Sequence, residues 1–401
     1  MKSRSEEFEE WGTEVIFGRA KGFRAAMMRV VLRGASWLFR LVVLARLYLF
    51  HSSIARQARL GMLVVSVGNI TVGGTGKTPV VELLARTLTL RGRKVAILTR
   101  GYKSADLDKP QEWRDKDGRL PENLPKIASD GKTRYLSPLY SGDEPFMLAK
   151  NLDGVAVLVD KNRIKSGIFA IEHLGCDTLL LDDGMQYLKL AHELDIVLVD
   201  CGAPFGTGAM LPRGTLREPR SSLARASYII LTKCGGKPQD ELISAIRKYN
   251  PVADIIVSDH GPRYLENVFT GERLPLKALR GKWVACLSGI ARPESFENSL
   301  RSLGAHVEIC RRFPDHHWFE QTELQEFYDR CADRAMDMIV TTEKDAVRLE
   351  KPEEDPEVPI YFLRIEVEIY QGREAWERCV DRICGISEPR PRDEWQPSSS
   401  F

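Results

Sequence analysis

The sequence lacks the paired cysteines that would indicate a disulfide framework or a structural zinc site. Its eight cysteines include no C-x-x-C pair, and they lie singly in apolar or mixed segments, as at Cys176, Cys286 and Cys310. Isolated cysteines of this kind are typical of proteins that fold in a reducing compartment. We therefore expect free thiols, with neither disulfides nor a cysteine-bound zinc ion.

A charge-free apolar run that could cross a bilayer is also absent. A transmembrane helix needs about 18–20 residues with almost no charge, and arginines interrupt every candidate stretch. Acidic residues are missing between Val15 and Leu60, where nine Lys or Arg residues occur without any Asp or Glu. No clean apolar run precedes a small-residue cleavage site, which argues against a secretory signal peptide.

The basic N-terminal segment combines these arginines with large apolar side chains. Arg29, Arg33, Ser36 and Arg40 are spaced i, i+4, i+7 and i+11, so they share one stripe of a helix. We predict that residues 1–60 form a membrane-associated amphipathic helix in the bilayer interface, where each nearby Lys or Arg adds about 1 kcal/mol of attraction to anionic lipids. A short tilted span and a helix packed on the protein core are the alternatives.

The rest of the chain shows the alternation of strands and helices that is typical of α/β proteins. We predict a P-loop NTPase-type, doubly wound parallel sheet over residues 61–250, a β-rich linker over 251–281 and a second, smaller α/β domain over 282–385. The polar segment 104–135 is interpreted as an inserted surface loop, and the Pro/Ser-rich tail 386–401 as disordered. The net charge of +2 favours no class of partner, and we expect no nucleic acid.

A glycine-rich stretch predicts a phosphate-binding loop. It reads S-V-G-N-I-T-V-G-G-T-G-K-T-P over residues 66–79, between an apolar strand and a helix. Backbone N–H groups of such a loop bind phosphates at the positive end of the helix. Lys77 is expected to reach the β- and γ-phosphates, and the Thr78 hydroxyl to ligate Mg²⁺. The usual spacing would place glycine at Thr71, so a chance glycine-rich turn is the alternative.

Paired carboxylates follow two other predicted elements. An apolar strand ends in Asp182 and Asp183, which is the arrangement of a Walker B segment that presents an acid to Mg²⁺. Adjacent carboxylates repel each other unless a cation compensates them. Asp143 and Glu144 open a helix, where the helix dipole alone favours acids, although a catalytic base and a metal contact fit equally well. Gly235 stands where a GTPase base-reading motif has Asp, which favours ATP over GTP.

The second half contains the cluster Asp315-His316-His317. Adjacent histidines point in different directions, and no third ligand is spaced to join them in a metal site. We interpret the cluster as a histidine polarised by an acid in the cleft between the domains. A solvated turn is the alternative.

Nine motifs in this order resemble the tetraacyldisaccharide 4′-kinase family, the lipid A 4′-kinases. They are G-N-I-T-V-G-G-T-G-K-T-P, T-R-G-Y, G-D-E-P, V-D-K-N-R, L-D-D-G-M-Q, L-P-R-G-T-L-R-E-P, L-S-G-I-A-R-P, F-P-D-H and T-T-E-K-D-A. The resemblance implies an ATP- and Mg²⁺-dependent kinase at the cytoplasmic face of the bacterial inner membrane. Its implied acceptor is the 4′-hydroxyl of a tetraacylated glucosamine disaccharide 1-phosphate, and its product is lipid IVA.

The resemblance also implies a role for individual residues. Asp143 matches the proposed general base, His316 the histidine that supports it, and Lys77 a catalytic lysine. The matched ATP-binding positions are Thr71, Val72, Gly73, Gly74, Thr75, Gly76, Lys77 and Thr78. The matched metal-site positions are Thr78, Glu144, Asp182, Asp183 and Glu218. The matched substrate contacts are Asn69, Tyr102, Arg163, Gln186 and Arg217.

One position departs from the family pattern. Tyr187 stands where the family commonly has histidine, so it can donate a hydrogen bond or stack but cannot carry a positive charge. Two other functions remain as alternatives to the kinase. One is a membrane-associated P-loop ATPase that acts as a switch or adaptor, and the other is a non-catalytic nucleotide-binding scaffold.

Overall fold

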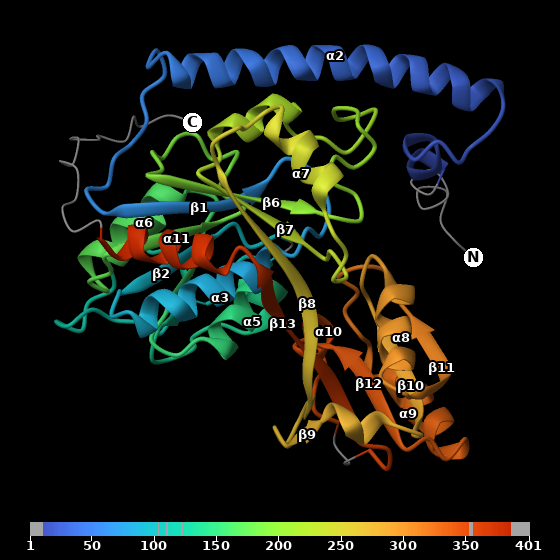
Figure 1. The fold of residues 1–401 in the computed structure, drawn as a ribbon. Helices are drawn as coiled ribbons and strands as arrows, with labels where there is room; N and C mark the ends of the chain where they lie inside the picture. Colours follow the sequence, from blue (N-terminus) through green and yellow to red (C-terminus); the bar gives the residue numbers. More distant parts are fainter. Residues whose placement is uncertain (1–10, 103, 110, 122, 353–355, 386–401) are drawn as a thin grey trace.

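A computed structural model describes residues 11–102, 104–109, 111–121, 123–352 and 356–385. The predicted disordered tail, 386–401, lies outside the described residues. Figure 1 shows a larger and a smaller lobe joined by two long strands, with one long helix lying across the larger lobe. A single sheet of 13 strands runs through both lobes.

The larger lobe holds the parallel sheet that the sequence predicts, with one antiparallel strand, residues 126–130, at its edge. Its strands are β1 (Leu63–Asn69), β2 (Val95–Thr99), β3 (Lys126–Asp130), β4 (Ala156–Val159), β5 (Thr178–Asp182), β6 (Leu194–Asp200) and β7 (Tyr228–Thr232). They lie in the order β7-β6-β1-β5-β2-β4-β3. β1 is parallel to both neighbours, with Val65 opposite Leu180 of β5 and Leu194 of β6. The phosphate loop and the Asp182 strand end therefore lie side by side.

Apolar residues on both faces of these strands explain why helices cover both sides. In β1, Val65 and Val67 face the core under α3 (Lys77–Leu90), α5 (Asp143–Asn151) and α11 (Arg373–Gly385), whereas Val64 faces the core under α6 (Arg163–Glu172). The alternation follows from the two-residue repeat of a strand. This arrangement confirms the predicted doubly wound architecture.

The smaller lobe is a second α/β unit. It contains β10 (Trp283–Ser288), β11 (His306–Arg312), β12 (Met338–Thr342), α8 (Pro293–Ser302), α9 (Gln321–Asp333) and α10 (Glu343–Ala346). The lobes are connected by β8 (Asp254–Asn267) and β13 (Ile360–Gln371), which pair antiparallel along most of their length. Other elements are α4 (Pro138–Ser141), α7 (Asp240–Arg247), β9 (Arg273–Pro275) and two 3₁₀ helices, η1 (Arg220–Arg225) and η2 (Leu276–Leu279).

Two segments differ from their interpretation in the sequence. The predicted surface loop 104–135 contains β3, so that interpretation is wrong for residues 126–130, where Ile127 is buried and its N–H donates to Gln111. One apolar residue between polar neighbours gives no periodicity that would show a strand. At the end of the range 282–385, α11 returns to the larger lobe, where Trp376 and Cys379 join the core under α3.

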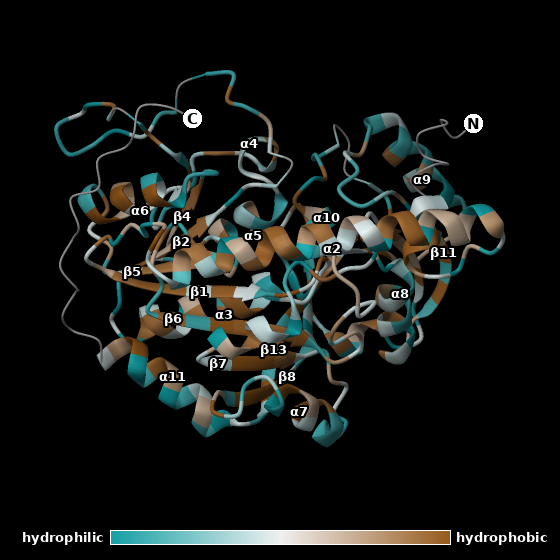
Figure 2. Ribbon diagram, turned by 90° about the horizontal axis from the view of Figure 1, so that it is seen from above, coloured by the Kyte–Doolittle hydropathy of each residue, from teal (hydrophilic) through white to brown (hydrophobic). Residues whose placement is uncertain are grey.

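Helix α2 (Phe23–His51) contacts the larger lobe along one narrow face. The buried Ser36 hydroxyl donates to the carbonyl of Met210 and accepts from the N–H of Arg213, each at 2.9 Å. Other faces expose large apolar side chains, among them Trp37 (61% exposed) and Leu41 (60%). Figure 2 shows these apolar patches along the helix. Among the described helices, none has the length and apolar character needed to cross a membrane.

The expectation that every cysteine is a free thiol is wrong for one pair. Cys201 and Cys234 form a disulfide, with their Cα atoms 5.0 Å apart. They follow the ends of the neighbouring parallel strands β6 and β7, and the Cys201 N–H donates to the carbonyl of Thr232 at 2.9 Å. Strand adjacency brings them together across 33 residues of sequence, which isolated cysteine positions cannot reveal.

Candidate active site

The phosphate loop leaves β1 at Asn69 and enters α3 at Lys77. Gly76, before the helix, has φ +80°, and a Cβ there would lie 2.1 Å from His260 Cε1. Glycine is therefore required at this position. Thr71, where the usual motif has glycine, is buried, forms a bridge with Leu216 of the 202–220 loop and accepts a hydrogen bond from the Asn69 amide on its hydroxyl at 3.2 Å. None of these contacts requires glycine.

The first turn of α3 contacts acids from two other elements. Lys77 Nζ lies 3.3 Å from Asn69 Oδ1 and 3.4 Å from Asp183 Oδ1. The Thr78 hydroxyl donates to Glu144 Oε2 at 3.1 Å. The phosphate loop and the end of β5 meet at one edge of the sheet, as the carboxyl ends of adjacent parallel strands do, and the start of α5 contacts them there.

The two acids at the end of β5 have opposite electrostatic surroundings. Burial, together with the nearby Glu144 carboxylate, raises the pKa of Asp182 to about 7, although Lys77 acts against this rise. Burial also acts to raise the pKa of Asp183, but Lys77 and Arg217 outweigh it, so that pKa is lowered. Arg217 donates to Asp183 Oδ2 at 2.7 Å. Asp183 therefore contacts two cations, whereas Asp182 forms no ion pair among the described residues.

The residues around Asp182 fit a divalent cation. Asp182 Oδ1 is buried without a hydrogen-bond partner, and the carboxylate beside it belongs to Glu144. Among the described residues, no three His, Cys, Asp or Glu side chains form a metal cage. Mg²⁺ does not need three protein ligands, because it is commonly held by one or two carboxylates together with phosphates and water.

Glu218 has a different environment from the other acids that we matched to a metal site. It is buried, with one carboxylate oxygen accepting from Gln186 at 3.1 Å and the other from Arg225 at 2.7 Å. Gln186 also donates to the carbonyl of Asn69 at 3.0 Å. These contacts join Glu218 to the phosphate loop through Gln186.

Asp143 and His316 come together from the two lobes. Asp143 is the first residue of α5, and His316 lies in the loop after β11 with φ +66°. His316 Nδ1 is 2.9 Å from Asp143 Oδ2. The Tyr102 ring approaches the imidazole edge-on, with centroids 5.5 Å apart. Because Asp143 directly precedes Glu144, this pair lies beside the phosphate loop.

Tyr187, the departure from the family pattern, lies against Arg163. Its hydroxyl accepts from the Arg163 backbone N–H at 3.1 Å, and the guanidinium carbon lies 5.0 Å from the centre of its ring. Burial lowers the pKa of Arg163, and the ring face is a favourable neighbour for this buried cation. The tyrosine therefore supports the start of α6 and the position of Arg163 without a charge of its own.

Sequence reasoning missed three side chains around the phosphate loop. The Lys233 ammonium donates to the carbonyl of Gly74, and the Thr232 hydroxyl donates to that of Thr75 at 2.8 Å. His260 of β8 packs on Gly76, and burial with nearby Lys233 lowers its pKa to about 4. The segment 232–235 can be recognised in the sequence as a strand end. The contact of His260 in the linker strand β8 with the phosphate loop cannot be recognised from the sequence.

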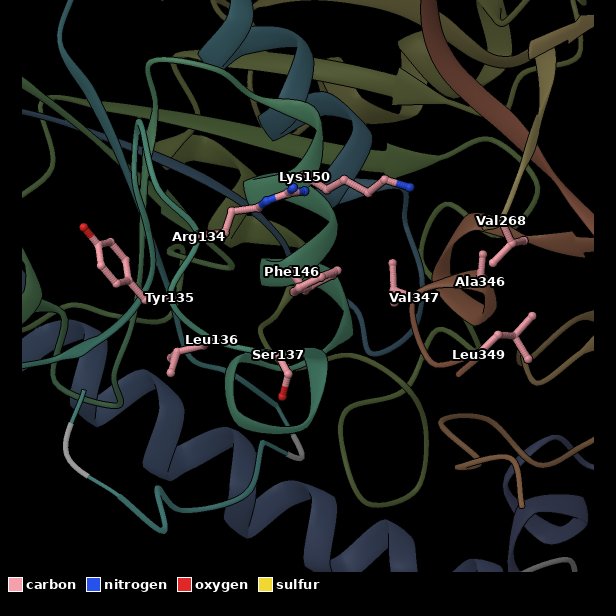
Figure 3. A pocket seen from close by; sticks show the side chains of 10 residues that line it. All are labelled: Arg134, Tyr135, Leu136, Ser137, Phe146, Lys150, Val268, Ala346, Val347 and Leu349. Carbon is pink, nitrogen blue, oxygen red and sulfur yellow. The ribbon is translucent and has the colours of Figure 1, made fainter. Parts of the chain in front are cut away.

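A cavity of about 470 Å³ opens between the lobes along α5. Figure 3 shows Phe146 and Lys150 of α5 on one side of it and Ala346 and Val347 on the other. The spacing of Asp143, Phe146 and Lys150 puts them on one face of the helix. The Asp143 pair and this cavity thus share the interface between the lobes.

The family comparison explains why these elements occur together. The sequence model of the Tetraacyldisaccharide-1-P 4'-kinase family matches residues 28–384. The chain belongs to this family. Among curated relatives, the Tetraacyldisaccharide 4'-kinase of Anaeromyxobacter sp. (strain K) is 39% identical over 387 residues, which cover 95% of this chain and 98% of the relative. That of Geobacter sulfurreducens is 37% identical, covering 83% and 87%.

A solved structure of the same family has the same fold. The crystal structure of LpxK from Aquifex aeolicus in complex with ATP is 27% identical, with a TM-score of 0.67, and the match covers 89% of this chain and 99% of that one. The kinase family and the α/β fold predicted from the motifs are confirmed. The roles of individual site residues stay predictions.

Proposed function

We propose that this kinase transfers the γ-phosphate of ATP, with Mg²⁺, to the 4′-hydroxyl of a tetraacylated glucosamine disaccharide 1-phosphate, giving lipid IVA. One observation carries the proposal beyond nucleotide binding, namely the 2.9 Å contact between His316 and Asp143 beside the phosphate loop. A switch ATPase needs no such base for an alcohol, whereas a kinase needs one that is positioned on the acceptor hydroxyl.

Phosphoryl transfer depends mainly on positioning and on neutralising charge. The backbone N–H groups of residues 71–76 and Lys77 bind the phosphates, with the N-terminus of α3 behind them. Thr78, Asp182 and Glu144 would hold Mg²⁺, which would balance the negative charge of the phosphates. Asp183 holds Lys77 and Arg217 in position.

Asp143 accepts the proton of the acceptor hydroxyl as that oxygen attacks phosphorus. His316 occupies Oδ2 of Asp143, which leaves Oδ1 for the hydroxyl. Because His316 belongs to the smaller lobe, the base is complete only when the lobes are together. Their closure also excludes water, which would otherwise compete with the lipid acceptor for the phosphoryl group.

The test is transfer of label from γ-³²P-ATP to the disaccharide 1-phosphate in mixed detergent micelles with Mg²⁺. Wild type should form a bis-phosphorylated lipid, and Asp143→Asn should retain ATP binding while turnover falls about 10²–10⁴-fold, as expected for loss of a general base. ATP hydrolysis by wild type without a labelled lipid would contradict the proposal and would favour the switch ATPase.

We further propose that α2 lies in the cytoplasmic interface of the inner membrane, where anionic lipids attract its arginines. The support is its unpartnered apolar surface beside a segment with nine basic and no acidic residues. Trp37→Glu with Leu41→Glu should abolish flotation with anionic vesicles, whereas Leu90→Glu, at an 82% exposed position on α3, should not. Equal flotation of the two variants would refute this placement.

A further inference from the structure

One charged side chain of the T-T-E-K-D-A motif has no role in the proposed reaction. Lys344 is the second residue of α10, whose start is held by the Thr342 N-cap and by an ion pair between Glu343 and Arg364. The Lys344 ammonium lies 3.1 Å from His316 Nε2 and 2.9 Å from Asp315 Oδ1. It therefore contacts the imidazole nitrogen that Asp143 does not.

We infer that Lys344 is a positioning residue that fixes the tautomer of His316. An ammonium group has three N–H donors and no acceptor, so the Nε2 atom it contacts must accept. The ring proton is then on Nδ1, 2.9 Å from Asp143 Oδ2, and is donated to that carboxylate. The inference rests on the proposed function, because it supplies the orientation of the histidine behind the base.

The charges around His316 agree with this proton position. A second ring proton would put an N–H opposite the ammonium donors and two positive charges 3.1 Å apart. Asp315 bonds Lys344 at 2.9 Å but is 3.9 Å from His316 Nε2, so its carboxylate holds the lysine and not the ring. The groups around His316 are Asp143 from α5, Lys344 from α10, Asp315 from the same loop and Tyr102 after β2. Arg348, after α10, faces Asp143.

The consequence for catalysis is a directed chain of donors from Lys344 through His316 to Asp143. A neutral imidazole with its proton on Nδ1 donates one hydrogen bond to the base and neutralises none of its charge. If the proton were on Nε2, the lone pair of Nδ1 would face the carboxylate, and the two groups would repel. Lys344 therefore acts on the base only through the ring of His316.

The direct test is ¹⁵N NMR of the full chain in detergent micelles with labelled histidine. The chain has seven histidines, and His316→Asn identifies the signals of interest. In wild type at pH 7 we expect His316 with Nδ1 protonated and Nε2 unprotonated. Lys344→Met, which keeps the length of the side chain without its N–H donors, should give the doubly protonated ring, because Asp143 still faces Nδ1 and Nε2 is left beside the Asp315 carboxylate. Unchanged His316 signals in Lys344→Met would overturn the inference.

Kinetics separate positioning from stability. Lys344→Met should lower kcat about tenfold, a part of the 10²–10⁴ that a positioned base contributes, with KM for ATP unchanged, and Lys344→Arg should restore most of kcat. Lys277→Met, at an exposed position on η2, is the matched control and should behave as wild type. A kcat loss that follows a lower unfolding midpoint, with the wild-type tautomer kept, would overturn the inference. Absence of lipid phosphorylation by wild type would refute the proposed function alone, because the NMR result does not depend on turnover.

Discussion

Two groups of carboxylates lie along α3 and α5, one at the first turns of both helices and the other around Glu82 and the last residue of α5, and they differ in how their charge is balanced. At the phosphate loop, Asp182 has an unpartnered oxygen and a pKa raised to about 7 by burial and by Glu144. Between the lobes, Glu82 and Glu343 both bind the guanidinium of Arg364, which lies 2.8 Å from the nearer Glu343 oxygen. Asp182 forms no ion pair among the described residues, whereas Glu82 and Glu343 share the guanidinium of Arg364.

The first group is a candidate binding site, whereas the second connects the two lobes, and we call Glu82, Glu343 and Arg364 the joint. Burial acts to lower the pKa of Arg364, but Glu343 and Glu82 outweigh it and raise that pKa, so Arg364 stays charged. Its two close partners, Glu82 of α3 and Glu343 of α10, tie the phosphate-loop helix to the smaller lobe. The Asp182 group instead keeps an unbalanced charge that a bound cation can compensate. The buried carboxylate without an ion pair is therefore the one that we assign to the active site.

The largest effect should come from removing the cation of the joint. Arg364→Met leaves Glu343 buried without a counter-charge and leaves Glu82 with only the half-exposed Arg86 as its ion-pair partner, and it should lower the free energy of unfolding by about 3–5 kcal/mol. Urea denaturation followed by circular dichroism measures this. Arg263→Met, on the paired strand β8, is the control, because its partners are exposed and the loss should be below about 1 kcal/mol. Equal losses in the two variants would show that Arg364 does not join the lobes.

The second largest effect should come from Asp182 at the phosphate loop, where a substitution should impair activity and not stability. Asp182→Asn removes an unbalanced buried charge, so stability in the absence of Mg²⁺ should stay the same or rise. Lipid phosphorylation should fall about 10²–10³-fold, the usual loss when one group that balances transition-state charge is removed. Glu82→Gln should do the opposite, losing about 1–3 kcal/mol of stability with turnover close to wild type. Loss of both properties in both variants would remove the distinction between the two groups.

The sequence predicted the first group and not the second, for a physical reason. The acids of the first group stand at the ends of elements that the sequence shows, with Asp182 and Asp183 at the end of β5 and Asp143 and Glu144 at the start of α5. The carboxyl ends of parallel strands meet at one edge of the sheet. Arg364 finds one partner 21 residues away and another 282 residues away. Those contacts depend on the register of β13 against β12 and on the packing of α3 against β13, which no local pattern specifies.

The same limit explains the other positions that sequence reasoning missed. Lys344 reaches His316 across 28 residues, and His260 packs on Gly76 from the linker strand. The family motifs placed Asp143 and His316 in the site, although 173 residues separate them. Motifs of a known family therefore identify catalytic residues that lie together in the fold, even when they are far apart in the sequence. The motifs do not identify which other residues hold the catalytic residues in position.

The smallest effect between neighbouring pH values is a pH dependence that reports the unbalanced charge directly. The pKa of Asp182 is about 7 in the folded protein and 3.8 is its ordinary value, so between about pH 4 and 7 the folded state holds a proton that the unfolded state has lost. Stability should therefore fall as pH rises through this window, by less than about 1.4 kcal/mol per pH unit from this group, and the fall should end above pH 7.

Comparison with Asp182→Asn isolates this contribution, because the other titrating groups cancel in the difference. Without Mg²⁺, the stability of wild type should decline relative to the variant from about pH 4 to 7, and urea titrations at several pH values measure the decline. Added Mg²⁺ should reduce the difference at pH 8, since it binds the ionised carboxylate of wild type and stabilises the folded state. The joint between the lobes already holds its cation, so Glu82→Gln should leave the Mg²⁺ response of wild type intact. A Mg²⁺ response that Asp182→Asn retains in full would assign the cation site to other acids of the cluster.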